Sequence, residues 1–206
     1  MRRLLLGLVG LVVGSATALA ADLATINTVP VPPPSRALYS PTPVHDWRGL
    51  YVGGSFGYVA GAVTGPITGN LSGLDIDVHA QYNFQNGNWV FGPFLAVPFP
   101  TATATIAVPV KINWAVVAGG RLGYSMGRWL PYVLAGGVVG GGTASAFTAT
   151  HTGYTVGLGV DYALDDRWSL GVRFAHVSLG KQPYGGLGSY GWDANSIAAT
   201  LNFKLY

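Results

Sequence analysis

Apolar and polar residues alternate along most of the chain beyond residue 46. The pattern is strictest in four segments, residues 75–84, 154–164, 168–175 and 197–205. It is looser in four others, residues 47–60, 88–97, 111–124 and 129–139. Because successive side chains of a strand point to opposite faces, each segment predicts a β-strand with one apolar and one polar face. The pattern therefore predicts eight strands.

The segments between the predicted strands alternate between short and long. Three short, polar segments occupy residues 85–87, 125–128 and 165–167. Four long segments, rich in Gly, Thr and Pro, occupy residues 61–73, 98–110, 140–151 and 180–193. Up-and-down barrels of the bacterial outer membrane have this asymmetry, with long loops outside and short turns on the periplasmic side. An even number of strands then places the C-terminus on the periplasmic side.

Composition indicates which face of these strands points outward. Hydrophobic residues make up 50% of the chain and charged residues only 9%, whereas a soluble domain carries about 25% charged residues. The polar faces are rich in Gly, Ala, Ser and Thr, which suit a narrow interior. Open sheet edges do not occur in lipid, so such a sheet must close. The prediction is an all-β fold over residues 47–206: a closed eight-stranded antiparallel up-and-down transmembrane β-barrel.

The first 46 residues have a different composition. Arg2 and Arg3 precede an apolar run at residues 4–14, and Ala18-Leu19-Ala20 provides a small-residue cleavage site. This is the pattern of a secretory signal peptide, and the run is too short to span a bilayer. We therefore expect residues 1–20 to be removed on export. Residues 21–46 contain six prolines, which predict an extended periplasmic tether, either a plain spacer or a recognition motif for a partner.

Aromatic residues gather near both ends of the predicted strands. Those near the short turns or the chain terminus are Trp47, Tyr51, Tyr124, Trp129, Tyr132, Trp168 and Tyr206. Those nearer the long segments are Tyr58, Trp114, Tyr154 and Trp192. Because Trp and Tyr are enriched at both membrane–water interfaces, the two groups predict two aromatic girdles.

Several Gly- and aromatic-rich motifs follow the same strands. They are Trp47-Arg48-Gly49-Leu50-Tyr51-Val52-Gly53-Gly54, then Gly120-Arg121-Leu122-Gly123-Tyr124 with Leu130-Pro131-Tyr132-Val133, and residues 153–162 with Trp168-Ser169-Leu170. Together they resemble strands of small alphaproteobacterial outer-membrane β-barrel proteins, the outer-membrane immunogenic or porin family. The resemblance implies an eight-stranded OmpA-like barrel in the outer membrane, and it does not imply an enzyme.

Two features depart from that family. Its members usually carry acidic residues on the third strand, where this chain has Phe94 and Ala96. They also tend to end in a Phe that the assembly machinery recognises, whereas this chain ends in Leu205-Tyr206. The partners that the resemblance implies are outer-membrane lipid, lipopolysaccharide and the barrel-assembly machinery, which would bind the C-terminal strand.

Polar residues on the inward faces predict what fills the barrel. Eight strands enclose only enough room for packed side chains, and charges in so narrow an interior need partners. We expect one network of salt bridges and hydrogen bonds among Asp77, His79, Gln81, Arg121, Asp161, Arg173, Asn202 and Lys204. A narrow passive pore through the same interior is the alternative.

His176 and Ser178 suggest a different function. They lie two residues apart, so they share one strand face, which by the alternation is the lipid-facing one. Lipid A deacylases are also eight-stranded outer-membrane barrels and carry a similar His-x-Ser pair, completed to a triad by an acid. Here Gly188 stands at the expected acid position, Leu179-Gly180-Lys181 replaces the usual residues after the serine, and Asp193 is the substitute acid. The other interpretation makes both residues polar groups at the membrane interface.

Other kinds of site find little support in the sequence. The chain has no Cys, and its four His lie in separate segments without metal-site spacing, so we expect no metal or cofactor. Beyond Arg2 and Arg3, no basic cluster accompanies the net charge of +3, which argues against nucleic-acid binding. The sequence thus predicts a structural, surface-exposed outer-membrane barrel. It does not indicate the oligomeric state or a ligand of the loops.

Overall fold

The computed structural model describes residues 45–100, 103–104, 110–144, 147–183 and 188–206. The strands are β1 (Gly49–Thr64), β2 (Gly69–Asn86), β3 (Trp89–Pro100), β4 (Thr103–Ala104), β5 (Val110–Tyr124), β6 (Trp129–Ala144), β7 (Phe147–Ala163), β8 (Trp168–Pro183) and β9 (Ser189–Lys204). Every strand in the described ranges belongs to one compact unit within residues 40–206. The predicted signal peptide and nearly all of the predicted tether lie outside the described residues.

No helix in the described ranges is long and apolar enough to cross a membrane.

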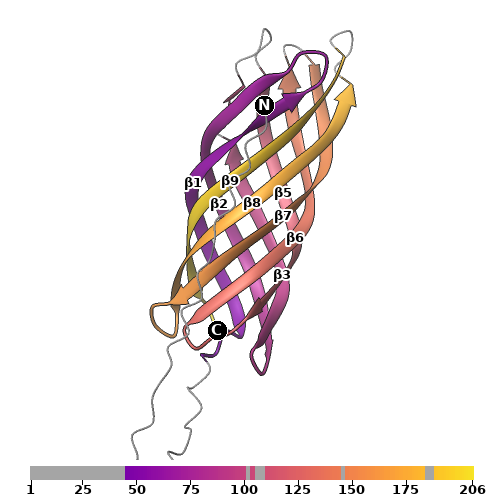
Figure 1. The fold of residues 1–206 in the computed structure, drawn as a ribbon. Helices are drawn as coiled ribbons and strands as arrows, with labels where there is room; N and C mark the ends of the chain where they lie inside the picture. The colour runs from indigo at the N-terminus through magenta and orange to yellow at the C-terminus, as the bar shows by residue number, and fades with distance from the viewer. Residues whose placement is uncertain (1–44, 101–102, 105–109, 145–146, 184–187) are drawn as a thin grey trace, which may run out of the picture. The chain divides into compact units, whose positions relative to one another are not determined.

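The strands close into a barrel (Figure 1). Every pairing is antiparallel, neighbours in sequence are neighbours in the sheet, and β1 pairs with both β2 and β9. The two-residue strand β4 is an addition that pairs with β2 and β5 beyond the end of β3. The predicted closed eight-stranded antiparallel barrel is therefore confirmed, and its closure gives every long strand a neighbour on both sides.

The two ends of the barrel differ. The turn end, at the bottom of Figure 1, holds the connections β2–β3, β5–β6 and β7–β8 together with the C-terminus, and the loop end holds the others. The turn-end connections are tight because Gly87 (φ 59°) and Gly127 (φ 64°) adopt the left-handed backbone that glycine tolerates. In the third turn, the Asp165 carboxylate accepts the backbone N–H groups of Arg167 and Trp168, each at 2.7 Å.

At the loop end the strands are longer than the alternation indicated. β1 and β2 pair as far as Val63 and Gly69, and β6 and β7 pair as far as Ala144 and Phe147. Most of the long loops expected at residues 61–73 and 140–151 is therefore strand. Backbone hydrogen bonds between strands form whatever the side chains are, so a hairpin can continue where hydrophobic alternation fades. Strands of 16 to 18 residues also exceed the roughly 9–11 residues that cross a bilayer.

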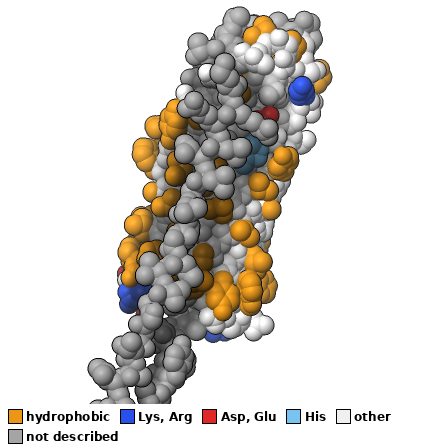
Figure 2. Space-filling view, viewed as in Figure 1, with side chains coloured by type: hydrophobic (Ala, Val, Ile, Leu, Met, Phe, Trp, Pro, Cys, Tyr) orange, Lys and Arg blue, Asp and Glu red, His pale blue; other side chains and the backbone are white. Residues whose placement is uncertain are grey.

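The outer wall is apolar. Large hydrophobic side chains stand exposed at alternate positions, among them Phe56, Leu158 and Ile197, each more than half exposed. On the face seen in Figure 2, hydrophobic side chains cover the flank and Lys and Arg lie toward the two ends. This is the outward-apolar arrangement that the composition predicted, and it is the reverse of a soluble β-sandwich.

Aromatic side chains on the outer wall form cross-strand pairs near the turn end. Ring centroids are 5.2 Å apart for Trp89–Tyr124, 4.6 Å for Trp129–Tyr162 and 4.8 Å for Trp168–Phe203. Nearer the loop end, Tyr58, Trp114 and Tyr154 are exposed. Four aromatic residues expected in the girdles are buried instead: Trp47, Tyr51, Tyr132 and Trp192. In the strands these residues have the inward parity, so their rings fill the lumen rather than the interface.

Candidate functional site

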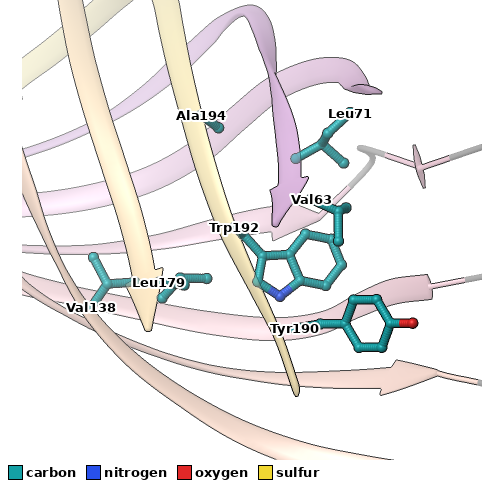
Figure 3. Close-up of a cluster of buried hydrophobic side chains, with 7 residues drawn as sticks. All are labelled: Val63, Leu71, Val138, Leu179, Tyr190, Trp192 and Ala194. Atoms are coloured by element: carbon teal, nitrogen blue, oxygen red, sulfur yellow. The ribbon is translucent and has the colours of Figure 1, made fainter. Parts of the chain in front are cut away.

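The lumen of the barrel is filled in three layers. At the turn end, the turn-end plug consists of Trp47, Val90, Leu130 and Ala163, all at most 1% exposed. At the loop end, the loop-end plug consists of Val63, Leu71, Val138, Leu179, Tyr190, Trp192 and Ala194 (Figure 3). Between the plugs lies a polar layer of hydrogen-bonded and charged side chains. The site is therefore built from side chains that the alternation turns inward.

One half of the polar layer centres on Arg121 of β5. Its Nη2 lies 2.8 Å from Oδ2 of Asp161 on β7, and its Nη1 donates to Oε1 of Gln81 on β2. The guanidinium carbon stands 3.9 Å above the ring centroid of Tyr132 on β6. Asp161 Oδ1 also accepts from the Thr200 hydroxyl at 3.5 Å. Because an unpaired charge in such an interior is costly, each group depends on the others.

The other half centres on Asp77 of β2. Its carboxylate pairs with the Arg173 guanidinium from β8 and accepts the Ser55 hydroxyl from β1 at 2.6 Å. His79 Nδ1 lies 2.7 Å from Asp77 Oδ1, and His79 Nε2 lies 2.7 Å from Asn202 Oδ1 on β9. The two halves together draw polar side chains from seven of the eight long strands. The eighth, β3, presents Phe94 to the same small space.

A close backbone approach makes room for Asp161. Gly171 on β8 is paired directly with Asp161 on β7, and both face inward. A Cβ at Gly171 would lie 2.2 Å from Asp161 Oδ1 and 2.7 Å from the Val160 carbonyl oxygen. A larger residue at this position would therefore displace the carboxylate or the backbone beside it.

Lys204 lies apart from the expected network. Its Nζ donates to the Asp46 carbonyl at 3.0 Å and stands 3.8 Å from Asp46 Oδ2 at the turn end. Burial raises the pKa of Asp46, but hydrogen bonds from the Arg48 side chain and backbone outweigh it, so the net pKa is lowered. Burial likewise lowers the pKa of His45 beside it. The seven other expected residues all lie in the polar layer.

Three residues of the polar layer were not expected there from the sequence: Ser55 and Thr200, which were not singled out, and Tyr132, which was expected in a girdle. Each has the inward parity of its strand, so the alternation alone places it in the lumen. What the alternation does not give is which inward residues meet across the lumen, because that depends on strand stagger.

The outer wall holds the other expected group. Ser178 of β8 donates its hydroxyl directly to Asp193 Oδ1 of β9 at 2.6 Å. His176 Nδ1 lies 3.0 Å from Asn195 Oδ1, and its ring stands 6.3 Å from that of Tyr154. A hydrolytic triad needs the imidazole between the hydroxyl and the carboxylate. Here the structure brings the serine and the acid together and turns the histidine to a different partner.

Within the described ranges, no group of three or more His, Cys, Asp or Glu side chains is arranged to hold a metal ion.

An apolar outer wall around a filled, charge-paired interior defines the class as an integral membrane β-barrel. Residues 7–204 match the family described as outer membrane protein beta-barrel domain, and the chain belongs to that family. It is an outer-membrane protein, and barrels of this kind lie among lipid and lipopolysaccharide. The family resemblance seen in the sequence motifs is thereby confirmed.

Two curated relatives cover most of the chain. The 31 kDa outer-membrane immunogenic protein of Brucella melitensis biotype 1 is 28% identical over 209 residues, spanning 83% of this chain and 87% of that protein. The 22 kDa outer membrane protein of Rhizobium leguminosarum bv. viciae is 28% identical over 170 residues, spanning 79% and 80%. Among solved structures, Neisserial surface protein A (NspA) has a TM-score of 0.56 at 13% identity, covering 76% of this chain and 97% of that one. The last likeness concerns the fold alone.

Proposed function

We propose that this protein is a structural outer-membrane barrel that does not conduct solutes and that presents its loop end to the cell exterior. The observation that carries the proposal is the filled lumen. Polar side chains from seven strands contact one another at its middle through hydrogen bonds, ion pairs and a cation–π contact, and an apolar plug closes each end. An eight-stranded barrel encloses only enough room for packed side chains or one small ligand, so no open channel passes such plugs.

The same proposal covers export and orientation. Residues 1–20 act as a signal peptide, residues 21–46 form a periplasmic tether, and the barrel-assembly machinery binds the C-terminal strand β9. The short turns lie in the periplasm, as is usual for outer-membrane barrels. The Leu50 N–H donates to the Tyr206 carbonyl at 3.2 Å, so the C-terminus and the start of β1 belong to the same side.

Planar-bilayer recording tests the filled lumen. The folded state is first verified by gel mobility, because a folded barrel migrates differently from its boiled form. The expected result is no steady conductance from folded protein, with the boiled sample as the control. A steady, large conductance that appears only with folded protein would support the passive pore and exclude the proposal.

Cysteine labelling tests the orientation. The natural chain has no Cys, so one introduced thiol reports one position. Lys181→Cys places the thiol on an exposed residue at the loop end, and Asp166→Cys places it on an exposed residue of the β7–β8 turn. On intact cells a membrane-impermeant maleimide should label Lys181→Cys and should reach Asp166→Cys only after the outer membrane is permeabilised. The reverse pattern would contradict the proposed orientation.

A further inference from the structure

The loop-end half of the lumen contains empty space beneath the loop-end plug. A cavity of about 150 Å³ is lined mainly by apolar side chains, including Val59, Leu71, Val117, Val138, Leu179 and Trp192. A second cavity of about 90 Å³ lies between it and the polar layer. Both are lined by Asp75, Pro98, Val117, Val177 and Ser196, so they adjoin. The smaller cavity is also lined by Asp77, Thr155 and Arg173 of the lumen, whereas Asp75 and Ser196 are the polar side chains of the larger one. We call the larger, mainly apolar cavity the apolar chamber.

The barrel wall is interrupted beside this chamber. The pairing of β3 with β5 ends at Ala96 and Val117, although β3 continues its pairing with β2 as far as Pro100. Among the described residues, the next pairing to β5 is that of Thr103 on β4 with Lys111. Pro98 and Pro100 stand two residues apart, so they would donate toward the same neighbouring strand, and proline has no N–H to donate. In the β3–β5 register the Ser125 N–H donates to the Asn88 carbonyl, so even-numbered residues of β3 direct their N–H groups toward β5. The two prolines therefore remove two N–H donors on the β5 side.

The large cavity reaches the outer wall at this interruption. Besides its inward-facing residues, it is lined by Leu74 and Phe99, whose side chains are on the outer surface and are 44% and 50% exposed. Leu74 lies just past the last residue of β2 that pairs with β3. The chamber thus has apolar contact with the membrane-facing side as well as with the lumen.

The volume and the lining of the chamber indicate which class of ligand it would bind. A mainly apolar cavity of about 150 Å³ has the size and lining that accept molecules such as benzene or xenon. The polar layer separates the chamber from the turn end, so occupancy does not require a conducting pore. We propose that the apolar chamber binds small apolar molecules of the size of a single aromatic ring, which enter through the wall between β3 and β5. This inference goes beyond the structural role and does not depend on the orientation of the barrel.

Methyl NMR of the folded chain in detergent micelles, titrated with benzene, tests the binding site. Neighbouring residues supply internal controls, because Val117 and Val138 face the lumen whereas Val116 and Val139 face outward. The expected result is saturable shifts at the lumen methyl groups and only gradual, unsaturated shifts at the outer ones as benzene partitions into the micelle. The same gradual response at both sets would overturn the proposal.

Two variants make the test specific. Val117→Phe fills the chamber and should abolish the saturable shifts at Val138 and Leu179, whereas Val116→Phe adds the same ring outside and should preserve them. If Val117→Phe does not fold, Ala115→Leu takes its place, since Ala115 lines the same cavity. Saturable shifts that persist in a folded chamber-filling variant would refute the assignment.

The route of entry has a separate test. Replacing Pro100 by Val restores one N–H donor on the β5 side and should extend the β3–β5 pairing, while Pro98, which lines the chamber, stays in place. Benzene exchange measured from the line shapes should then slow, while the shift at saturation is kept. An unchanged exchange rate would overturn entry through the wall.

Discussion

Arg121 and Asp161 form an ion pair across strands that are not neighbours. They lie on β5 and β7, with β6 between them, and the guanidinium Nη2 is 2.8 Å from the carboxylate Oδ2. Their side chains are only 4% and 2% exposed. Tyr132 of the intervening strand places its ring under the guanidinium. The pair therefore lies inside the lumen and is not a surface ion pair.

Removing one partner of this pair should be costly. Asp161→Leu leaves the Arg121 charge buried without its carboxylate, and we expect a loss of about 3–5 kcal/mol of unfolding free energy. Arg121→Met with Asp161→Leu removes both charges and should recover most of that loss. Urea unfolding followed by gel mobility measures both. A double variant as unstable as the single one would contradict the buried-charge explanation.

Gly171→Ala tests the room that Asp161 needs. The added Cβ would meet the Asp161 carboxylate and the Val160 carbonyl, so the pair with Arg121 must shift, at a cost of about 1–3 kcal/mol. Gly137→Ala is the matched control, because the nearest atom to its added Cβ is 4.0 Å away. The same unfolding assay should find the control close to the wild type. Equal losses in the two variants would show that any strand glycine is equally sensitive.

Asp165 should make the β7–β8 turn sensitive to acid. Hydrogen bonds from the Trp168 and Arg167 backbones lower the pKa of its carboxyl from the ordinary value of 3.8. A lowered folded pKa means stability that is present above the ordinary value and is lost as the pH falls through the folded one. Asp165→Asn should therefore lose less stability than the wild type between about pH 5 and pH 2. The measurement is the urea midpoint of unfolding as a function of pH, with Asp166→Asn as the control. If the midpoints of the wild type and Asp165→Asn fall equally with pH, the stabilising role of the Asp165 carboxylate in the turn is contradicted.

His176 and Ser178 should not act on lipid A. The Ser178 hydroxyl donates to Asp193 with no imidazole between them, so the serine lacks the base that would activate it. Mass spectrometry of lipid A from cells making the wild type or His176→Ala should find the same acylation in both, at equal amounts of folded barrel. Loss of an acyl chain with the wild type alone would instead establish the deacylase.

The sequence predicted most of the barrel because its wall is repetitive. Alternation between lipid-facing and lumen-facing positions assigned the correct face to Asp77, Arg121, Asp161 and Arg173 before any contact was known. This alternation was least informative in segments where apolar and polar side chains do not alternate. At the loop end, Gly- and Thr-rich segments were expected to be loops and are strands, since backbone pairing needs no particular side chain.

Which side chains meet in the lumen could not be predicted from the sequence of any single strand. Trp192 and Tyr132 were expected in the girdles because of their residue type, but in the barrel both have the inward parity and are buried in the lumen. Likewise Lys204 shares the inward face but sits at the turn end beside Asp46, too far along its strand to join the layer around Arg121. Distance along the barrel axis is set by the stagger of the strands, which no single strand encodes.

By itself, the sequence determined the class of fold and the side of each strand that meets lipid, because both follow from a period of two and a shortage of charge. Tertiary structure alone decided which buried groups meet. It paired Arg121 with Asp161 and Arg173 with Asp77, joined Ser178 to Asp193 without the histidine, and opened a chamber where Pro98 and Pro100 interrupt the wall. The physical reason is that these contacts join strands distant in sequence, whose relative register appears only when the barrel closes.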